Sequence, residues 1–181
     1  MTAILVLIAR VFNAMYGYEG LNICLRIMPS SAIVRILLHY GALVGKKVRI
    51  QPPFILHNAD QDIPILKNLT IGDDCYIGRF CLFDLQDRIE IGNKVTISHH
   101  VTLNTHTNAG KSPLSKVFLP TSQGSIIIES GVYLGLNVTV LQGVNIGQES
   151  LIGANSLVNT TIPAHVSAFG QPCRIQKQLS V

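Results

Sequence analysis

The sequence predicts an all-β solenoid behind a helical N-terminal segment, and a spacing of six residues is the main reason. An aliphatic residue returns at every sixth position in the second half of the chain, as Ile128, Leu134, Val140, Ile146, Ile152 and Val158. On an α-helix a step of six turns the side chain by about 240°, so these residues would share no face. Two positions earlier stands a small or aliphatic residue, such as Val138 before Val140, so each pair would face one side of a short strand.

The remaining residues of each hexad are suited to turning the chain. Three positions after an aliphatic residue stand Asn137, Gly143 and Asn155, where a left-handed backbone conformation costs little. The same spacing recurs upstream in Ile71, Ile77 and Phe83 and, after a slip of two residues, in Ile91, Ile97 and Leu103. Short strands with a turn after each one predict a solenoid, in which every repeat buries its apolar side against its neighbours.

Two further motifs carry a resemblance to a known family. A stretch of 19 residues without hexads, 107–125, begins directly after His106, and a Gly-x-Pro-x-Arg motif stands at residues 170–174. Together with the hexads, these motifs resemble the hexapeptide-repeat acyltransferases over residues 44–177, in particular the branch of galactoside, maltose and capsule or colanic-acid O-acetyltransferases. The resemblance implies a left-handed parallel β-helix of triangular section, with three hexads in each coil.

The domain organisation follows from where the hexads begin and end. We expect an N-terminal helical segment at 1–43, the left-handed β-helix at 44–169 and a C-terminal tail at 170–181. Loop excursions at 56–69 and 107–125 interrupt the hexads. Interruptions of a solenoid are where function is usually carried, so both excursions are candidates for the active site.

The N-terminal segment has helical rather than hexad texture. Residues 3–16 and 31–40 predict two helices. The apolar run 3–9 ends at Arg10 and is too short to span a bilayer, and neither a basic n-region nor a small-residue cleavage site marks a signal peptide. We expect a helical cap over the open end of the solenoid; the alternative is a membrane-surface anchor that gives peripheral membrane contact.

Composition fits one soluble domain with a narrow aliphatic core. Of 181 residues, 48% are hydrophobic and only 6% aromatic, with no Trp. The formal charge of +4 comes with Lys and Arg that are scattered apart from the pair Lys46 and Lys47, which favours anionic small molecules and argues against a nucleic-acid partner. The four cysteines show no CxxC spacing, so we expect small buried thiols in a reducing, cytoplasmic compartment: Cys24, Cys75, Cys81 and Cys173.

The resemblance implies acetyl-CoA as the acyl donor. The cofactor-binding positions of the family fall on Tyr133, Ala154, Asn159, Thr160, Arg174 and Lys177. Ala154 would offer backbone groups beside the extended pantetheine arm, while Arg174 and Lys177 would neutralise cofactor phosphates. The alternative for the two cations is a solvated C-terminal tail.

Direct transfer from a thioester needs a base for the acceptor hydroxyl, and a histidine is suited to that task. The resemblance gives this catalytic role to His106, at the entrance of the second excursion, with His99 and His100 as rivals. It gives substrate binding to Asp84 and, as a second candidate, to Asp87. For both carboxylates the alternative is a structural role in the turn that follows the strand.

The sequence therefore predicts an acetyl-CoA-dependent O-acetyltransferase that acts on a saccharide, and the resemblance implies a homotrimer with active sites between neighbouring copies. An N-acetyltransferase acting on an amino sugar or small amine is the nearest alternative. A non-catalytic hexapeptide protein is another. A γ-carbonic-anhydrase-like protein would need three converging histidines, and no histidine follows His106 by eighteen residues, so we expect no metal site.

Overall fold

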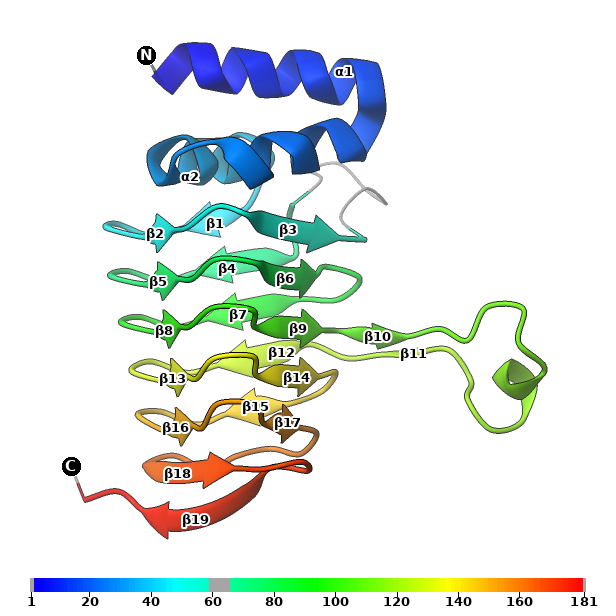
Figure 1. Ribbon diagram of the computed structural model, residues 1–181, viewed down its shortest axis with the longest axis vertical. Coiled ribbons are helices and arrows are strands. Elements are labelled where there is room, and N and C mark those ends of the chain that lie inside the picture. Colours follow the sequence, from blue (N-terminus) through cyan, green and yellow to red (C-terminus); the bar gives the residue numbers. More distant parts are fainter. Residues whose placement is uncertain (1, 59–65, 181) are drawn as a thin grey trace.

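The computed structural model describes residues 2–58 and 66–180 and consists of two helices on one end of a stack of short strands (Figure 1). The helices are α1 (Thr2–Ile27) and α2 (Ser30–His39). Residues 59–65 of the predicted excursion at 56–69 lie outside the described residues.

Apart from a two-stranded ribbon, the strands form three sheets, and within each of these the neighbours are parallel except for the last pair of sheet B. Sheet A contains β1 (Leu43–Val44), β4 (Leu69–Ile71), β7 (Ile89–Ile91), β12 (Ile126–Ile128) and β15 (Asn145–Ile146). Sheet B contains β2 (Arg49–Ile50), β5 (Tyr76–Ile77), β8 (Thr96–Ile97), β13 (Tyr133–Leu134), β16 (Leu151–Ile152), β18 (Val166–Phe169) and β19 (Arg174–Gln178). Sheet C contains β3 (Phe54–His57), β6 (Cys81–Asp84), β9 (Thr102–Asn104), β14 (Thr139–Leu141) and β17 (Leu157–Val158).

The chain visits sheets A, B and C in turn, and we call each such round a coil. The chain turns from sheet B into sheet C at the B–C corner, and it leaves sheet C for the next coil at the C–A corner. The long interruption at 107–125 leaves from the C–A corner of the third coil. It forms an antiparallel ribbon of β10 (His106–Thr107) and β11 (Ser122–Gln123) with a 3-10 turn at Pro113–Lys116, and it projects from the stack as an arm (Figure 1).

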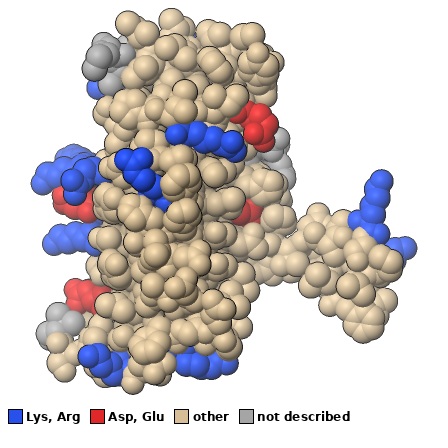
Figure 2. All heavy atoms as spheres, viewed as in Figure 1, with Lys and Arg blue, Asp and Glu red and all other residues tan. Residues whose placement is uncertain are grey.

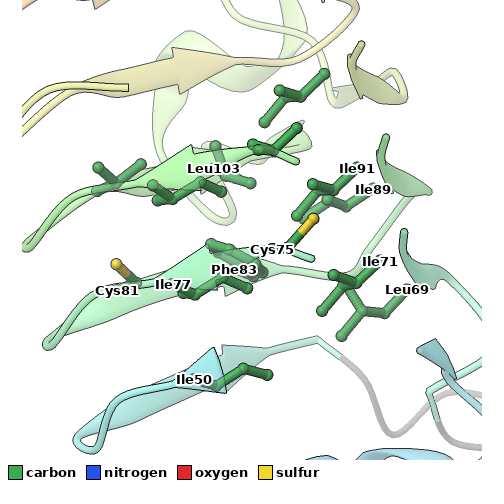
Figure 3. Close-up of a cluster of buried hydrophobic side chains, with 14 of the residues drawn as sticks. Ile50, Leu69, Ile71, Cys75, Ile77, Cys81, Phe83, Ile89, Ile91 and Leu103 are labelled. Carbon is green, nitrogen blue, oxygen red and sulfur yellow. The ribbon is translucent and has the colours of Figure 1, made fainter. Parts of the chain in front are cut away.

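The register agrees with three hexads per coil. Ile128 pairs with Ile146, and Val140 pairs with Val158, one coil further along. The aliphatic member of each hexad points into the stack and is almost fully buried, so successive coils share one continuous core (Figure 3). Because the core is close-packed, truncating fully buried Ile152 to Ala would cost about 2–5 kcal/mol.

The turn residues have the predicted left-handed conformation. Asn137, Gly143 and Asn155 have φ of 56°, 74° and 58°. At the B–C corner the Asn137 amide donates to Asn155 Oδ1 at 2.9 Å, which links the turns of two coils. Asparagine and glycine pay little for this conformation, so the hexad sequence favours a turn after each strand.

The helical segment differs from the prediction in one respect. The first predicted helix continues to Ile27 after a kink at Gly17, whose φ is 58° and ψ is −147°. The second half of α1 folds back, and the backbone of Phe12 lies so close to Gly20 that no side chain would fit there. Two glycines are poor helix formers, so the sequence did not predict helix beyond residue 16.

The second half of α1 and α2 cover the end of the stack. Asn22 accepts from the backbone N–H of Leu56 at 3.1 Å and donates to its carbonyl at 2.9 Å. These bonds occupy backbone groups of the terminal strand β3 that would otherwise be an unpaired edge. The described residues thus agree with a helical cap at this end.

The other end of the chain is more ordered than a tail. Strand β19 turns back and pairs antiparallel with β18, so residues 174–178 of the predicted tail at 170–181 are part of sheet B. The four cysteines are free and buried, as predicted. Burial raises the pKa of each thiol, and it raises that of Cys81 to about 11.

Candidate active site

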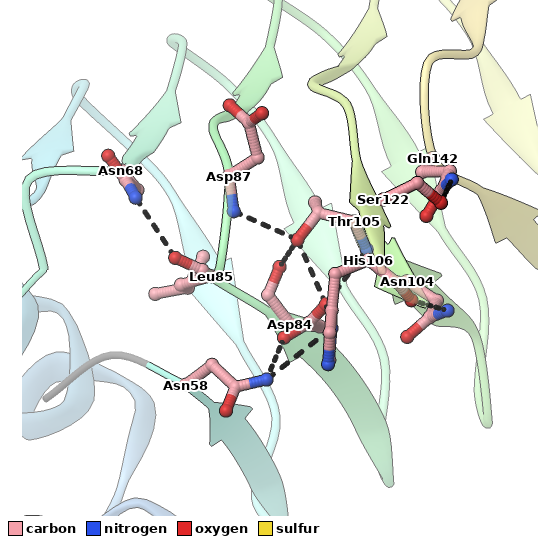
Figure 4. Close-up of polar contacts among 10 residues, drawn as sticks. All are labelled: Asn58, Asn68, Asp84, Leu85, Asp87, Asn104, Thr105, His106, Ser122 and Gln142. Atoms are coloured by element: carbon pink, nitrogen blue, oxygen red, sulfur yellow. Dashed lines mark hydrogen bonds and ion pairs between the residues drawn. The ribbon is translucent and has the colours of Figure 1, made fainter. Parts of the chain in front are cut away.

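The C–A corner brings together polar residues from three successive coils (Figure 4). Asn58 follows β3, Asp84 ends β6, and His106 follows β9 at the start of the arm. The parallel register of sheet C places His57 beside Asp84, so the residues that end these strands lie over one another. Asn58 and Asp84 are 26 residues apart because the excursion at 56–69 lies between them, and Asp84 and His106 are 22 residues apart across the slip of two residues.

The strongest contact at this corner is between His106 and Asp84. His106 Nδ1 lies 2.6 Å from Asp84 Oδ2; the histidine side chain is 20% exposed, and the aspartate is fully buried. Asp84 also accepts from the Asn58 amide at 2.7 Å, from the Thr105 backbone N–H at 3.0 Å and from the Thr105 hydroxyl at 2.9 Å. Both carboxylate oxygens are therefore bound by protein donors.

These donors decide the charge of the carboxyl group. Burial alone would raise the pKa of Asp84, but the hydrogen bonds from His106, Asn58 and Thr105 outweigh it and hold the pKa below its ordinary value. Asp84 is thus an anion over the ordinary pH range. A buried carboxylate with this many donors is fixed in position, and it fixes the imidazole that it contacts.

The pair also determines which ring nitrogen of His106 can act as a base. An ionised carboxylate only accepts hydrogen bonds, so Nδ1 must donate. In the neutral ring the lone pair is then on Nε2, which can take a proton. The Asn58 amide nitrogen lies 3.5 Å from Nδ1, too far to compete with the 2.6 Å contact to Asp84.

Further contacts hold the backbone around His106. The Asn104 amide donates to the His106 carbonyl at 2.8 Å, and Thr105 is fully buried between the strand and the arm. The ring of His57, from the first coil, lies 6.4 Å from that of His106 between centroids, and its side chain is exposed. The sequence interpretation missed Asn58 and Thr105, because only the stacking of coils brings them to Asp84.

The two predicted acceptor-binding carboxylates are placed differently from each other. Asp84 has no exposed surface and lies behind His106, so it does not face an acceptor directly. Asp87 is half-buried; its backbone N–H donates to the Thr105 hydroxyl at 3.0 Å, and its carboxylate accepts from the N–H of Arg88 at 2.7 Å. Both carboxylates therefore make contacts that agree with the alternative left open by the sequence, a structural role in the turn that follows the strand.

The predicted acetyl-CoA residues do not gather at His106 within one chain. Asn159 and Thr160 follow β17, so they lie at the same C–A corner two coils further along. Ala154 lies at the B–C corner, and Tyr133, 41% exposed, is on the outer face of sheet B. The cationic pair Arg174 and Lys177 is on β19, exposed at the far end of the stack.

The rival histidines lie at the opposite corner of sheet C. His99 Nδ1 accepts from the backbone N–H of Arg79 at 2.8 Å. His100 has a left-handed backbone, with φ of 60°, and its ring stacks on Phe80 with centroids 4.9 Å apart. Among the residues that the structure describes, neither has an ion pair with a carboxylate of the kind that His106 has. Within the described ranges, no group of three or more His, Cys, Asp or Glu side chains could hold a metal ion.

Comparisons with known proteins agree with the fold. A model of the hexapeptide repeat of succinyl-transferase matches residues 125–160. The galactoside O-acetyltransferase of Lactococcus lactis is 36% identical over 138 residues, which are 76% of this chain and 63% of that protein. The galactoside O-acetyltransferase of Escherichia coli is 32% identical over 140 residues, 77% of this chain and 64% of that protein. The chain thus spans just under two thirds of the length of these relatives.

A solved structure is similar over nearly the whole chain. It is a hexapeptide-repeat-containing acetyltransferase of Vibrio cholerae in complex with acetyl coenzyme A, with a TM-score of 0.77 and 26% identity over 95% of this chain and 89% of that one. The three-sided stack and its interrupted hexads define a hexapeptide-repeat protein. In its sequence and fold the chain is similar to hexapeptide-repeat acetyltransferases, among them two galactoside O-acetyltransferases.

Proposed function

We propose that the chain is an acetyl-CoA-dependent O-acetyltransferase that acts on a saccharide hydroxyl, with His106 as general base. The observation that carries the proposal is the 2.6 Å contact between His106 Nδ1 and the buried Asp84 carboxylate, which leaves Nε2 as the basic nitrogen. The names of the two galactoside O-acetyltransferases support a sugar hydroxyl as acceptor. The acetyl coenzyme A in the Vibrio cholerae structure supports the donor.

The reaction that fits this geometry is direct transfer. The acceptor hydroxyl gives its proton to His106 Nε2 while its oxygen bonds to the thioester carbonyl carbon. The carbon–sulfur bond then breaks, the acetyl group remains on the acceptor oxygen, and the proton held by His106 passes to the departing sulfur. An acetyl ester and the CoA thiol are the products. Asp84 positions the imidazole through Nδ1 and stabilises its positive charge while Nε2 holds the proton.

The acceptor and donor contacts in this proposal are on other residues. Asp87, half-buried at the C–A corner, has remaining acceptor capacity for a sugar hydroxyl. Arg174 and Lys177 would bind the phosphates of acetyl-CoA as exposed cations. The backbone at Ala154, the polar side chains of Asn159 and Thr160, and the ring of Tyr133 would line the donor along the outside of sheets B and C.

A homotrimer is part of the same proposal. Donor residues on several faces of the stack meet His106 only if a neighbouring copy completes the cleft. The arm supports such an assembly, because its tip extends away from its own stack and exposes four large apolar side chains: Leu114, Val117, Phe118 and Leu119. A second copy would cover them. We also propose that the stack is a left-handed parallel β-helix, as in the family. Because free thiols persist in a reducing compartment, we propose a cytoplasmic location.

An acceptor screen tests the function. Purified protein is given acetyl-CoA with neutral galactosides, glucosides and their amino-sugar counterparts, and release of the CoA thiol and the acetylated product are both measured. We expect a neutral sugar to be acetylated on oxygen. Acetylation of amino sugars alone would show that the enzyme is an N-acetyltransferase, and the absence of transfer to all acceptors, with intact folding, would contradict the proposal.

A further inference from the structure

The first half of α1, before the kink at Gly17, is apolar on both sides. Its inner side packs on the core through Leu5, Val6, Ala9 and Phe12. Its outer side exposes residues that recur with the helical period, and we call these residues the outer stripe: Ile4, Leu7, Ile8, Val11, Ala14 and Met15. A helix that is hydrophobic all round is typical of a buried position or of contact with a membrane.

Helix α2, the neighbour of α1, has a polar exposed side. On α2 the buried residues are Ala32, Ile33, Ile36 and Leu37, whereas the exposed side carries Ser31, Arg35 and His39, with Leu38 as its one exposed large apolar residue. Among residues 4–16 of α1, the exposed residues outside the outer stripe are only Arg10 and Tyr16. The difference is therefore specific to the outermost helix and is not a general property of the helical layer.

The charges around the outer stripe favour an anionic partner. Arg10 is exposed between the apolar residues of this helix, and no Asp or Glu precedes Glu19. Arg26 and Arg35 are exposed in the layer beneath. In Figure 2 the helical end is almost entirely tan, and most of the charged side chains visible on the body lie below it over the stack. An apolar surface with flanking cations is suited to the headgroup and acyl boundary of an anionic bilayer.

The geometry favours a helix that lies on the bilayer. By length and composition alone, Ile4–Ile27 is long and apolar enough to cross a membrane. The kink at Gly17, however, divides it, and Asn22 in the second half is bonded to Leu56 of the stack. The outer half, residues 2–16, is only about 22 Å long at 1.5 Å per residue, less than the 30 Å of a bilayer core.

We propose that the outer stripe docks this protein on the surface of an anionic lipid bilayer, with the first half of α1 lying in the plane of the membrane. The inference is independent of the reaction proposed above, since it uses none of the residues of the C–A corner. It has one consequence for that corner. Because β3 contacts α1 and leads directly into Asn58, docking holds the site near the lipid surface.

Vesicle sedimentation tests the docking. The full chain is mixed with vesicles of phosphatidylcholine containing a minority of phosphatidylglycerol, and with phosphatidylcholine alone. We expect sedimentation with the anionic vesicles, and a loss of more than about tenfold in binding for the double variant Leu7→Glu with Val11→Glu. The matched control, Leu38→Glu with Leu43→Glu, adds the same charge to exposed apolar residues outside the stripe and should bind like the wild type. Equal loss in the control, or full binding by the stripe variant, would overturn the proposal.

A fluorescence experiment separates a lipid surface from a second copy of the chain. The chain contains no Trp, so Met15→Trp in the outer stripe provides a single reporter, with Leu38→Trp as its control. Anionic vesicles should shift the Met15→Trp emission to the blue and leave the control unchanged. A blue shift without vesicles that grows with protein concentration, together with a larger particle in light scattering, would mean that the stripe binds a second copy and would refute lipid docking. No shift under either condition would also refute it.

Discussion

The two corners of sheet C both carry histidine in the third coil, and the difference between them lies in what each Nδ1 contacts. At the C–A corner His106 Nδ1 donates to a buried carboxylate, Asp84, at 2.6 Å. At the B–C corner His99 Nδ1 accepts from the backbone N–H of Arg79 at 2.8 Å. The neutral His99 ring must then carry its proton on Nε2, so it has no lone pair to offer there. A histidine can therefore present a free lone pair on Nε2 at one corner and accept a backbone hydrogen bond that holds a turn at the other.

A third histidine sharpens the point. His165 Nδ1 lies 3.4 Å from Glu149 Oε2, and both side chains are about 40% exposed. An exposed ion pair of that length is screened by water and contributes little. Proximity to a carboxylate is therefore not sufficient to fix the position and the tautomer of a histidine ring. Burial of the carboxylate and the additional donors from Asn58 and Thr105 distinguish the His106 pair.

The largest expected effect comes from removing the base. A positioned general base contributes about 10²- to 10⁴-fold to the rate, so His106→Ala should lower kcat by that factor. Binding of acetyl-CoA should remain near normal, because the imidazole acts on the acceptor proton. Steady-state kinetics and donor binding by calorimetry measure both quantities. If His106→Ala keeps more than about a tenth of the wild-type kcat, the C–A corner does not carry the base.

The next effect concerns the positioning carboxylate. In Asp84→Asn the amide can donate to Nδ1, which would favour the tautomer with the proton on Nε2. We expect kcat to fall by about 10²-fold, less than in His106→Ala, with a smaller change in KM. Asp84→Glu should restore part of the rate if a carboxylate near Nδ1 is what matters. Asp87→Asn, at the same corner, should instead raise the KM for the acceptor with a smaller change in kcat. An equal loss of kcat there would mean that the loss in Asp84→Asn is not specific to the contact with His106.

The same substitution has a signature in acid stability. Because the folded-state pKa of Asp84 is below its ordinary value, its charge stabilises the fold above the ordinary carboxyl pKa of about 3.9, and this contribution is lost as pH falls through the lower folded-state value. Urea unfolding of the wild type should therefore lose stability on acidification. Asp84→Asn should be less stable near neutral pH and should lose less on acidification. Parallel pH profiles would contradict a charged, hydrogen-bonded Asp84.

A smaller effect is expected at the far end of the stack. If Arg174 and Lys177 bind the phosphates of acetyl-CoA, replacing either by Ala should raise the KM for acetyl-CoA with little change in kcat, as expected when uniform binding is removed. If the contact is to the 3′-phosphate, the KM values of wild type and variant should differ less with dephospho-acetyl-CoA than with acetyl-CoA. An unchanged KM in both variants would mean that these cations are solvated residues of β19.

How much of this could be predicted from sequence depended on the range of the interaction. The hexad spacing predicted the strands and the left-handed Asn137, since these follow from local periodicity. The family resemblance supplied three hexads per coil, which places Ile128 against Ile146. The group around Asp84 did not follow, because the excursion at 56–69 and the slip of two residues before Ile91 separate its members by distances that are not multiples of six. The spacing of six cannot show that Asn58 and His106 lie on either side of one carboxylate.

The helical layer shows a second kind of limit. Local propensity argues against helix around Gly17 and Gly20, yet tertiary packing makes both glycines useful: one turns the chain, and the other lets it pass the backbone of Phe12. Packing against the stack then supplies the stabilisation that propensity lacks.

The smallest expected effect is at the B–C corner, and it tests the comparison most directly. His99→Ala removes the acceptor for the Arg79 N–H. A fully buried donor left without a partner costs about 1–3 kcal/mol, so at this partly exposed site the free energy of unfolding should fall by no more than that. It should leave kcat within about twofold, because a ring with its proton on Nε2 contributes no base. His99→Gln, whose side-chain oxygen can accept the same N–H, should recover stability without changing kcat. If His99→Ala instead abolished turnover while melting normally, the tautomer argument would fail, and the base would have to be sought at the B–C corner.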